Sequence, residues 1–259
     1  MKLPLVWQPT PVIGELRKLF GQYELLNKQI RQLKAQVQSL LIEEGISERA
    51  IGQALVEHPG KAEANLAKLE LPECSRFCIR TSLRLLLALG KEKELVRAEI
   101  IRTGVPLEES AKLLMTIRGV TAFLALAFLA DVGDISRFPS LRKLYAYLGV
   151  VPGSRCSGGK TRDGHINRQS RALVRTLFSQ AVPHLVASTP ALGRFYQDLV
   201  ARRGYGRARI AVLRKVIGMM RRMLLSGTPY RGFEPALYER KLRDYRRELR
   251  KAEKQREVA

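Results

Sequence analysis

The chain has 259 residues, with 46 Lys and Arg against 24 Asp and Glu, and carries a formal net charge of +22. A protein this basic repels itself unless counter-ions or nucleic acid neutralise it, so the composition favours a polyanionic partner. Because no apolar run reaches about 18 residues and no leader with a basic start and an apolar core is visible, we expect no membrane partner and a cytoplasmic, nucleoid-associated protein.

Cysteine and aspartate limit the chemistry that the chain can perform. Its three cysteines, Cys74, Cys78 and Cys156, form an odd set that suggests neither a disulfide framework nor a four-ligand zinc site. No aspartate occurs before Asp131, whereas a two-metal nuclease site needs several carboxylates that converge on Mg²⁺. We therefore expect that this chain holds no metal site and binds no cofactor.

The first predicted element is a long helix whose apolar residues recur in alternating steps of three and four. Such a seam is typical of a helix that buries one narrow stripe against a partner helix. Gly45 ends the helix, and a second long periodic helix is expected from about 75 to 102. Residues 1–111 are therefore predicted to be a connector, either an antiparallel helical hairpin or a dimerising coiled coil, and we favour an arm that also pairs between protomers of a homo-oligomer. The seam consists of Leu16, Leu19, Tyr23, Leu26, Ile30, Leu33, Val37 and Leu40.

Small apolar residues after Gly104 predict a compact domain over residues 112–230. Its first feature, the turn around Gly119 followed by an apolar helix from 122 to 130, resembles a helix-hairpin-helix. In such hairpins the glycine turn points backbone N–H groups at a nucleic-acid phosphate. The usual second glycine is absent, with Thr121 near its place, so a plain helical turn remains an equal alternative.

The stretch from 155 to 165 places a hydroxyl between glycines and cations. Gly158 and Gly159 would let the backbone approach a ligand, and the neighbouring Arg155, Lys160 and Arg162 supply charge for anionic oxygens. Ser157 could bind a phosphate or attack it. The plainer alternative is a flexible basic surface loop, because Ser-Gly-Gly is common turn chemistry.

The rest of the chain is predicted to be helical and basic. A helix from 167 to about 184 would carry three arginines on one face as a clamp for a nucleic-acid backbone. Two further helices, 190–200 and 208–226, would be joined by a basic and aromatic loop, and residues 231–259 form a charged tail, either a single helix or a disordered arm. The predicted DNA or RNA contacts are Gly119, Arg155, Gly158, Gly159, Lys160, Arg162, Arg168, Arg171, Arg175, Arg202 and Arg203.

The fold class expected from these elements is mainly α, a long coiled-coil arm followed by a compact helical domain. Four motifs in order, residues 116–121 (TIRGVT), 129–138 (LADVGDISRF), 147–152 (YLGVVP) and 157–162 (SGGKTR), resemble the insertion-sequence one-ten transposases. The resemblance covers residues 112–230. Upstream, residues 31–46 look like the coiled-coil connector of that family.

The resemblance implies recombination of DNA by a nucleophilic serine, with Ser157 at the position of the nucleophile and Ser154 as a nearby alternative. In the family, an N-terminal RuvC-like domain with four acidic Mg²⁺ ligands and a structured guide RNA assist the reaction. This chain begins inside the connector, so the RuvC-like half of the site is expected to be missing. Lys160 and Arg162 would hold the scissile phosphate.

The residues leave several alternatives open. His165 and Asp163 are the local candidates for activating the serine, and His165 reads more readily as a loop or RNA contact. The chain is either a transposase or a truncated remnant that dimerises and binds DNA or RNA without chemistry. A helical RNA-binding or ribosome-associated factor is a third reading, which rests on charge alone.

Overall fold

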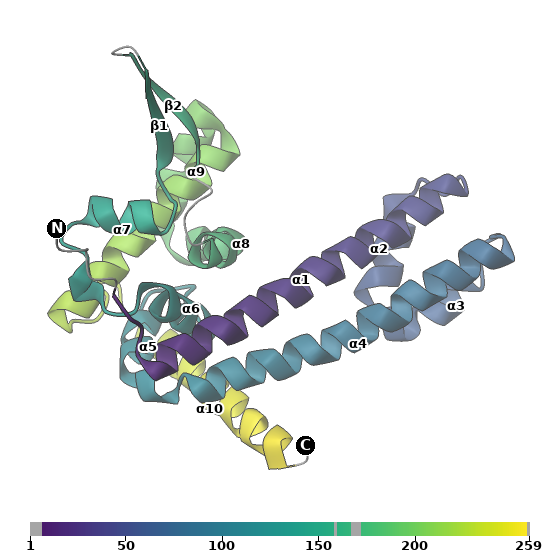
Figure 1. Ribbon diagram of the computed structural model, residues 1–259, viewed down its shortest axis with the longest axis horizontal. Helices are drawn as coiled ribbons and strands as arrows, with labels where there is room; N and C mark the ends of the chain where they lie inside the picture. Colours follow the sequence, from purple (N-terminus) through teal and green to yellow (C-terminus); the bar gives the residue numbers. More distant parts are fainter. Residues whose placement is uncertain (1–6, 158–159, 167–171, 258–259) are drawn as a thin grey trace, which may run out of the picture. The chain divides into compact units, whose positions relative to one another are not determined.

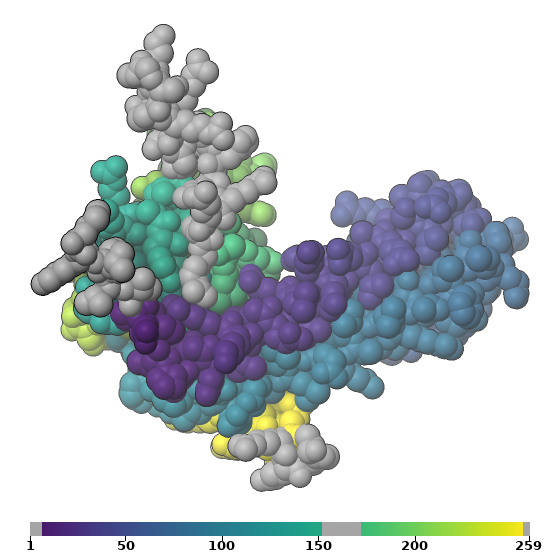
Figure 2. Space-filling view, viewed as in Figure 1, coloured from purple at the N-terminus to yellow at the C-terminus, as the bar shows by residue number. Residues whose placement is uncertain are grey.

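A computed structural model of the chain describes residues 7–157, 160–166 and 172–257 (Figure 1). For residues 152–157, 160–166 and 256–257 it describes the backbone alone, and these are among the atoms drawn grey in Figure 2. The described chain is mainly α-helical, as the sequence predicts. It divides into two compact units, residues 21–99 and residues 1–20 with 100–259. None of the described helices is both long enough and apolar enough to cross a bilayer.

The unit of residues 21–99 is a helical hairpin with two short helices at its tip. It comprises α1 (Pro11–Glu43) from residue 21 onward, α2 (Arg49–Glu57), η1 (Pro59–Lys61), α3 (Ala62–Leu66) and α4 (Glu73–Thr103) up to residue 99. The two long helices run antiparallel side by side (Figure 1). The core is made by Val37, Leu41, Leu55, Ala62, Leu66, Ile79, Leu83 and Leu86. Of the predicted seam, Ile30, Leu33 and Leu40 pack against this core, so α1 finds a partner helix within its own chain.

The second unit is built around α6 (Ala122–Val132), a helix in which every residue is buried. Its sequence is apolar on all sides, which is the pattern of a helix enclosed by others. It is preceded by η2 (Val105–Leu107) and α5 (Glu108–Met115), and followed by η3 (Ile135–Arg137), α7 (Leu141–Tyr147), α8 (Leu173–Ser188), α9 (Pro190–Ser226) and α10 (Pro235–Glu257). The rings of Phe128 on α6 and Phe178 on α8 pack edge to face, with 6.5 Å between their centroids.

Strands β1 (Pro152–Ser157) and β2 (Lys160–Ile166) form an antiparallel pair where the sequence indicated a loop. The mainly α fold class holds, but the loop predicted in this segment is a strand pair. A two-residue Gly-Gly connection is a recognised signal for a tight hairpin, because glycine reaches the positive φ angles that such turns require. The Gly-Gly pair is present in the sequence and favours a strand hairpin over a loop.

Helix α9 replaces the two predicted helices and their joining loop. It continues through residues 202–207 and is interrupted at Gly204 alone, where φ is 76° and ψ is 165°. The predicted break is thus in the right place, but it is a kink at a single glycine, since glycine adopts this backbone conformation without a Cβ clash. The helix ends at Gly227, which has a φ of 67°.

The charged tail forms one long helix that is anchored to the unit of α6. In α10 Leu242, Tyr245 and Ala252 are buried, at spacings of three and seven residues that mark a single apolar stripe. The Nζ of Lys241 donates to the carbonyls of Met115 and Ile117 at 2.7 and 2.6 Å. Of the two predicted alternatives the helix is therefore the one observed, and one face of it is packed.

Candidate functional site

The hairpin brings the positions of the predicted phosphate site to one face of a strand pair. In its register Ser157 lies opposite Lys160, and Arg155 lies opposite Arg162. Directly opposite residues of an antiparallel pair share a face, and so do residues two apart along a strand. Positions 155, 157, 160 and 162 therefore occupy one face of the hairpin, which gives it one serine among three cations.

Ser154, the alternative nucleophile, occupies the other face. It lies opposite Asp163, and the next pair along the register is Cys156 with Thr161. Two residues three apart on a strand of period two cannot share a face. The register thus separates two serines that the sequence leaves as alternatives, and it places the candidate base Asp163 on the face of Ser154.

The remaining predicted contacts of this segment are only partly covered by the structure. Gly158, Gly159, Arg168 and Arg171 lie outside the described residues, and so do the side chains of Arg155, Ser157, Lys160, Arg162 and His165. Their contacts with nucleic acid stay predictions. Arg175 is described and half-buried.

One arginine connects the two ends of the hairpin segment. Arg175, in the first turn of α8, donates from Nη1 to the carbonyl of Gly149 at 3.0 Å. Gly149 ends α7 with a φ of 64°, and the following Val150 is fully buried. Gly149, three residues before β1, is therefore hydrogen-bonded to α8, the helix that follows β2. Arg175 holds the base of the hairpin, a role that its prediction as a nucleic-acid clamp did not include.

Asp131 fixes the start of α8 from the end of α6. Its side chain is 0% exposed, and one carboxylate oxygen accepts the backbone N–H of Val174 at 3.1 Å. The N-cap residue Ala172 has no side-chain acceptor of its own, so a carboxylate 43 residues away satisfies one of the unpaired donors of the first turn. A negative charge is also favoured at a helix N-terminus. No pattern in the sequence indicates this role.

An arginine surrounded by aromatic rings holds the turn between α6 and α7. The guanidinium carbon of Arg137 lies 4.3 Å from the ring centroids of Trp7 and Phe138 and 4.6 Å from that of Tyr147. Its Nε donates to the carbonyl of Val132 at 3.0 Å. Trp7 is the single tryptophan of the chain, so its fluorescence reports on the folding of this unit.

The glycine turn predicted between α5 and α6 is present, and Gly119 has a φ of 78°. A Cβ at this position would lie 3.0–3.1 Å from atoms of Leu185 and Ser188 on α8. Glycine is therefore needed here both for its φ angle and for the close approach of α8. Thr121 caps α6 by accepting the N–H of Leu124 at 3.3 Å. A phosphate contact made by Gly119 stays a prediction.

Replacement of Gly119 by alanine is expected to lower the free energy of unfolding by about 2–4 kcal/mol, because backbone strain and overpacking add. Gly204→Ala is the matched control. Gly204 has a similar φ of 76°, and an added Cβ there would meet nothing within 4 Å. The control should lose only the backbone strain, about 1–3 kcal/mol, and so less than Gly119→Ala, because φ 76° with ψ 165° is a conformation that only glycine adopts readily. Equal losses for the two variants in urea unfolding followed by Trp7 fluorescence would show that α8 does not press on the turn.

Helix α9 carries an exposed row of cations. Arg202 and Arg203, both predicted contacts, are exposed, and so are the neighbouring Arg207 and Arg209. Positive charge concentrates in this half of the chain more strongly than the composition alone indicates. Residues 135–233 contain 19 Lys and Arg but only two acids, Asp163 and Asp198, which is a net charge of +17 out of the total +22. A running count of charge along the chain would have shown it.

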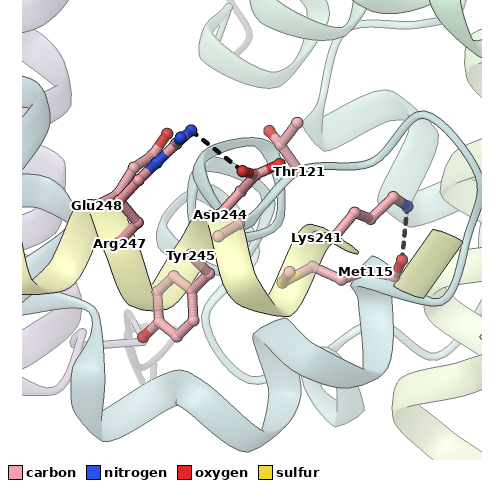
Figure 3. Close-up of a pocket in the computed structure, with 8 residues that line it drawn as sticks. Met115, Thr121, Lys241, Asp244, Tyr245, Arg247 and Glu248 are labelled. Carbon is pink, nitrogen blue, oxygen red and sulfur yellow. Dashed lines mark hydrogen bonds and ion pairs between the residues drawn. The ribbon is translucent and has the colours of Figure 1, made fainter. Parts of the chain in front are cut away.

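A pocket of about 180 Å³ lies between α10 and the start of α6 (Figure 3). Its charged lining is engaged within the protein. Lys241 donates to two main-chain carbonyls, and Asp244 pairs with Arg247 at 3.1 Å. We therefore interpret the pocket as a seam between packed helices. The lining residues are Met115, Thr121, Ala122, Lys241, Asp244, Tyr245, Arg247 and Glu248.

A rise in pH from 8 to 10 is expected to stabilise this unit by about 1–2 kcal/mol. Burial lowers the pKa of Lys241 from 10.5 to about 8 in the folded chain. Over this interval the unfolded chain binds more protons than the folded chain, so the free energy of unfolding rises with pH. A neutral amine keeps two N–H groups, so both carbonyl hydrogen bonds can persist. The rise in stability ends near pH 10, because burial raises the pKa values of Tyr238 and Tyr245 above their usual 10. Above that pH the unfolded chain loses its tyrosine protons before the folded chain does, so a further rise in pH favours unfolding.

The Lys241→Met variant should lack this rise between pH 8 and 10. Urea unfolding at three pH values, followed by Trp7 fluorescence, measures it. Parallel pH profiles for the variant and the parent chain would contradict the assignment of the rise to Lys241.

Metal-ligating side chains are dispersed over the part of the chain that the structure describes. There, no three His, Cys, Asp or Glu residues gather closely enough to hold a metal ion. The chemistry of the described residues is that of cations, backbone groups and aromatic rings.

Comparison with known proteins shows what part of this chain is similar to. Residues 111–197 match the model of the Transposase IS116/IS110/IS902 family. The chain is 28% identical over 137 residues to the transposase for insertion sequence element IS1111A of Coxiella burnetii, an alignment that covers 51% of this chain and 38% of that protein. It is 31% identical over 122 residues to a probable family 20 transposase of Pseudomonas aeruginosa, with coverage of 46% and 36%.

A third relative is the insertion element IS110 uncharacterized 43.6 kDa protein of Streptomyces coelicolor. It is 32% identical over 126 residues, which cover 48% of this chain and 31% of that protein. The alignments thus span between 31% and 38% of the length of these curated relatives.

Proposed function

We propose that this chain acts in DNA transposition with Ser157 as the nucleophile, because its residues 111–197 match the model of the Transposase IS116/IS110/IS902 family. The matched segment contains both strands of the hairpin. Three relatives of the chain are transposases or insertion-element proteins by name. The substrate proposed is the phosphodiester backbone of DNA.

In the proposed step the Ser157 hydroxyl gives up its proton and its Oγ attacks a phosphorus atom of one DNA strand. The bond from phosphorus to one bridging oxygen breaks, and that oxygen leaves as the hydroxyl of a strand end once it has taken up a proton. The phosphodiester energy is kept in a phosphoserine link. A second strand end then attacks the same phosphorus and releases the serine, so strands are exchanged without hydrolysis.

The observation that carries the proposal is the register of the hairpin. Position 157 shares its face with positions 155, 160 and 162, which are occupied by cationic residues of the kind that a phosphate requires. Positive charge near the scissile group stabilises the charge that develops on the phosphoryl oxygens in the transition state. Ser154 shares its face with Asp163, an acid that repels a phosphate.

We propose two further partners, a structured guide RNA and a second copy of the chain. The exposed cations of α9 support a polyanionic partner of either kind, DNA or RNA. On the helical hairpin of residues 21–99, Phe77 is 65% exposed and Ile42 is 55% exposed. Large apolar side chains that remain exposed there support pairing of the arm between protomers.

The test is strand joining by the full chain. It is supplied with DNA ends of its element, the guide RNA, and the RuvC-like domain with Mg²⁺ that the family resemblance implies. Ser157→Ala should abolish joining, and Ser154→Ala should leave it intact. Joining that survives Ser157→Ala would remove the proposed nucleophile. A parent chain that binds DNA but joins nothing under these conditions would favour the alternative, a binding protein without catalysis.

A further inference from the structure

The kink of α9 presents an aromatic ring to solvent. Tyr205 is 69% exposed, the highest fraction among the exposed large apolar side chains of the described residues. Gly204 precedes it with a φ of 76°, and Gly206 follows it. An added Cβ at either glycine would meet nothing within 4 Å, so neither glycine is required by the packing of a neighbour. Packing of the core therefore accounts neither for the tyrosine at this position nor for the glycines on either side of it.

The surroundings of Tyr205 are strongly cationic. Residues 201–207 are all exposed, and Arg203 and Arg207 stand two positions before and after the tyrosine. From residue 199 to residue 233 the sequence has nine Lys and Arg and no Asp or Glu. No acid within this stretch can neutralise the arginines or repel an anion.

We propose that the Gly204 kink is a binding site for an unpaired nucleotide, in which the Tyr205 ring stacks on the base and Arg203 and Arg207 contact the flanking phosphates. This inference rests on the proposed function, because it names the form of nucleic acid that the chain receives at α9, beyond the matched residues 111–197. It concerns a place distinct from the hairpin face that carries Ser157.

The combination of an exposed ring with cations fits an unpaired nucleotide better than a duplex. Cations alone attract the backbone of any nucleic acid, and they read neither base nor strandedness. An exposed aromatic face adds stacking, which requires a base whose own face is free. In a duplex each base is covered by its neighbours, so the tyrosine adds nothing there. The tyrosine should thus set the preference for single strands, while the arginines set the overall affinity.

The experiment measures binding of the full chain to three labelled probes of about 12 nucleotides or base pairs. They are a single-stranded DNA, a single-stranded RNA and a duplex DNA. Tyr205→Ala should weaken binding of at least one single-stranded probe by about tenfold to a hundredfold and leave duplex affinity within about twofold. Tyr205→Phe should bind as the parent does. The two single-stranded probes distinguish DNA from RNA as the source of the nucleotide.

Two control variants separate stacking from other effects. Leu225→Ala removes another exposed side chain of α9, 50% exposed, and should change no affinity. Arg203→Gln should weaken all three probes and reduce the dependence of affinity on salt by about one phosphate contact. Unchanged single-strand affinity in Tyr205→Ala, or an equal loss on single strands and duplex, would overturn the proposal. Because binding needs no chemistry, this result is independent of whether Ser157→Ala abolishes joining.

Discussion

Ser157→Ala is expected to reduce strand joining by at least about 10⁴-fold, because it removes the atom that forms the covalent link. The variant should still bind DNA within about twofold of the parent, since a neutral hydroxyl contributes little to a contact dominated by cations. The slope of log affinity against log salt should be unchanged for the same reason. Loss of chemistry with retention of binding is the result that distinguishes a nucleophile from a binding residue.

Ser154→Ala is the internal control for this result. It makes the same chemical change three residues away, on the opposite face of the same strand. If both variants lose joining to the same extent, then folding of the hairpin, and not the hydroxyl at position 157, is the property that was tested. If only Ser154→Ala loses joining, the nucleophile lies on the opposite face of the strand, at position 154.

Asp131→Ala is expected to lower the free energy of unfolding of its unit by about 2–4 kcal/mol. The substitution leaves the buried N–H of Val174 without the acceptor that it has in the folded chain, and it removes a negative charge from the start of α8. Asp131→Asn should lose less, because the amide keeps an acceptor oxygen. Urea unfolding followed by Trp7 fluorescence measures the loss in both variants. Trp7 reports on this unit because its ring packs on Arg137, which follows Asp131 closely in the chain.

Asp134→Ala provides the comparison for Asp131→Ala. Asp134 also accepts a backbone N–H, that of Ser136 at 2.8 Å, but it is exposed. Its removal should cost only about 0.5–1 kcal/mol, because water replaces the carboxylate. Equal costs at the two positions would mean that the buried capping contact between α6 and α8 is not important for stability.

The elements that follow from local sequence were predicted well. The seam from Ile30 to Leu40 packs as the heptad pattern indicates, and Gly45 ends α1 with a φ of 79°. Both depend on residues within a few positions of one another. The kink of α9 at Gly204 was likewise predicted as a break, since glycine alone has the freedom that the break requires.

The hairpin was missed although its signal was local. The Gly-Gly pair was interpreted as a phosphate loop because of the cations beside it, and the polar residues on both sides have no apolar alternation that would mark strands. The sequence of the tail is compatible with both a helix and a disordered arm for a similar reason. Its many charges conceal the short apolar stripe through Leu242 and Tyr245.

The contacts that position the hairpin could not be read from one sequence. Asp131 caps α8 across 43 residues, and Arg175 reaches a carbonyl 26 residues earlier in the chain. Neither pair has a spacing that a helix or strand imposes. Such contacts exist only once α6, α7 and α8 are packed, so tertiary structure decides them.

The most direct test of the proposed nucleophile is the site of the covalent link. The full chain, supplied with the guide RNA and the RuvC-like domain with Mg²⁺ as in the joining test, would be incubated with DNA ends whose strand exchange is stalled by omission of the second end, then digested and analysed by mass spectrometry. The expected result is a nucleotide attached through phosphate to the peptide that contains Ser157, and no such peptide from Ser157→Ala. A nucleotide attached to Ser154, or joined DNA formed without any protein-linked nucleotide, would contradict it.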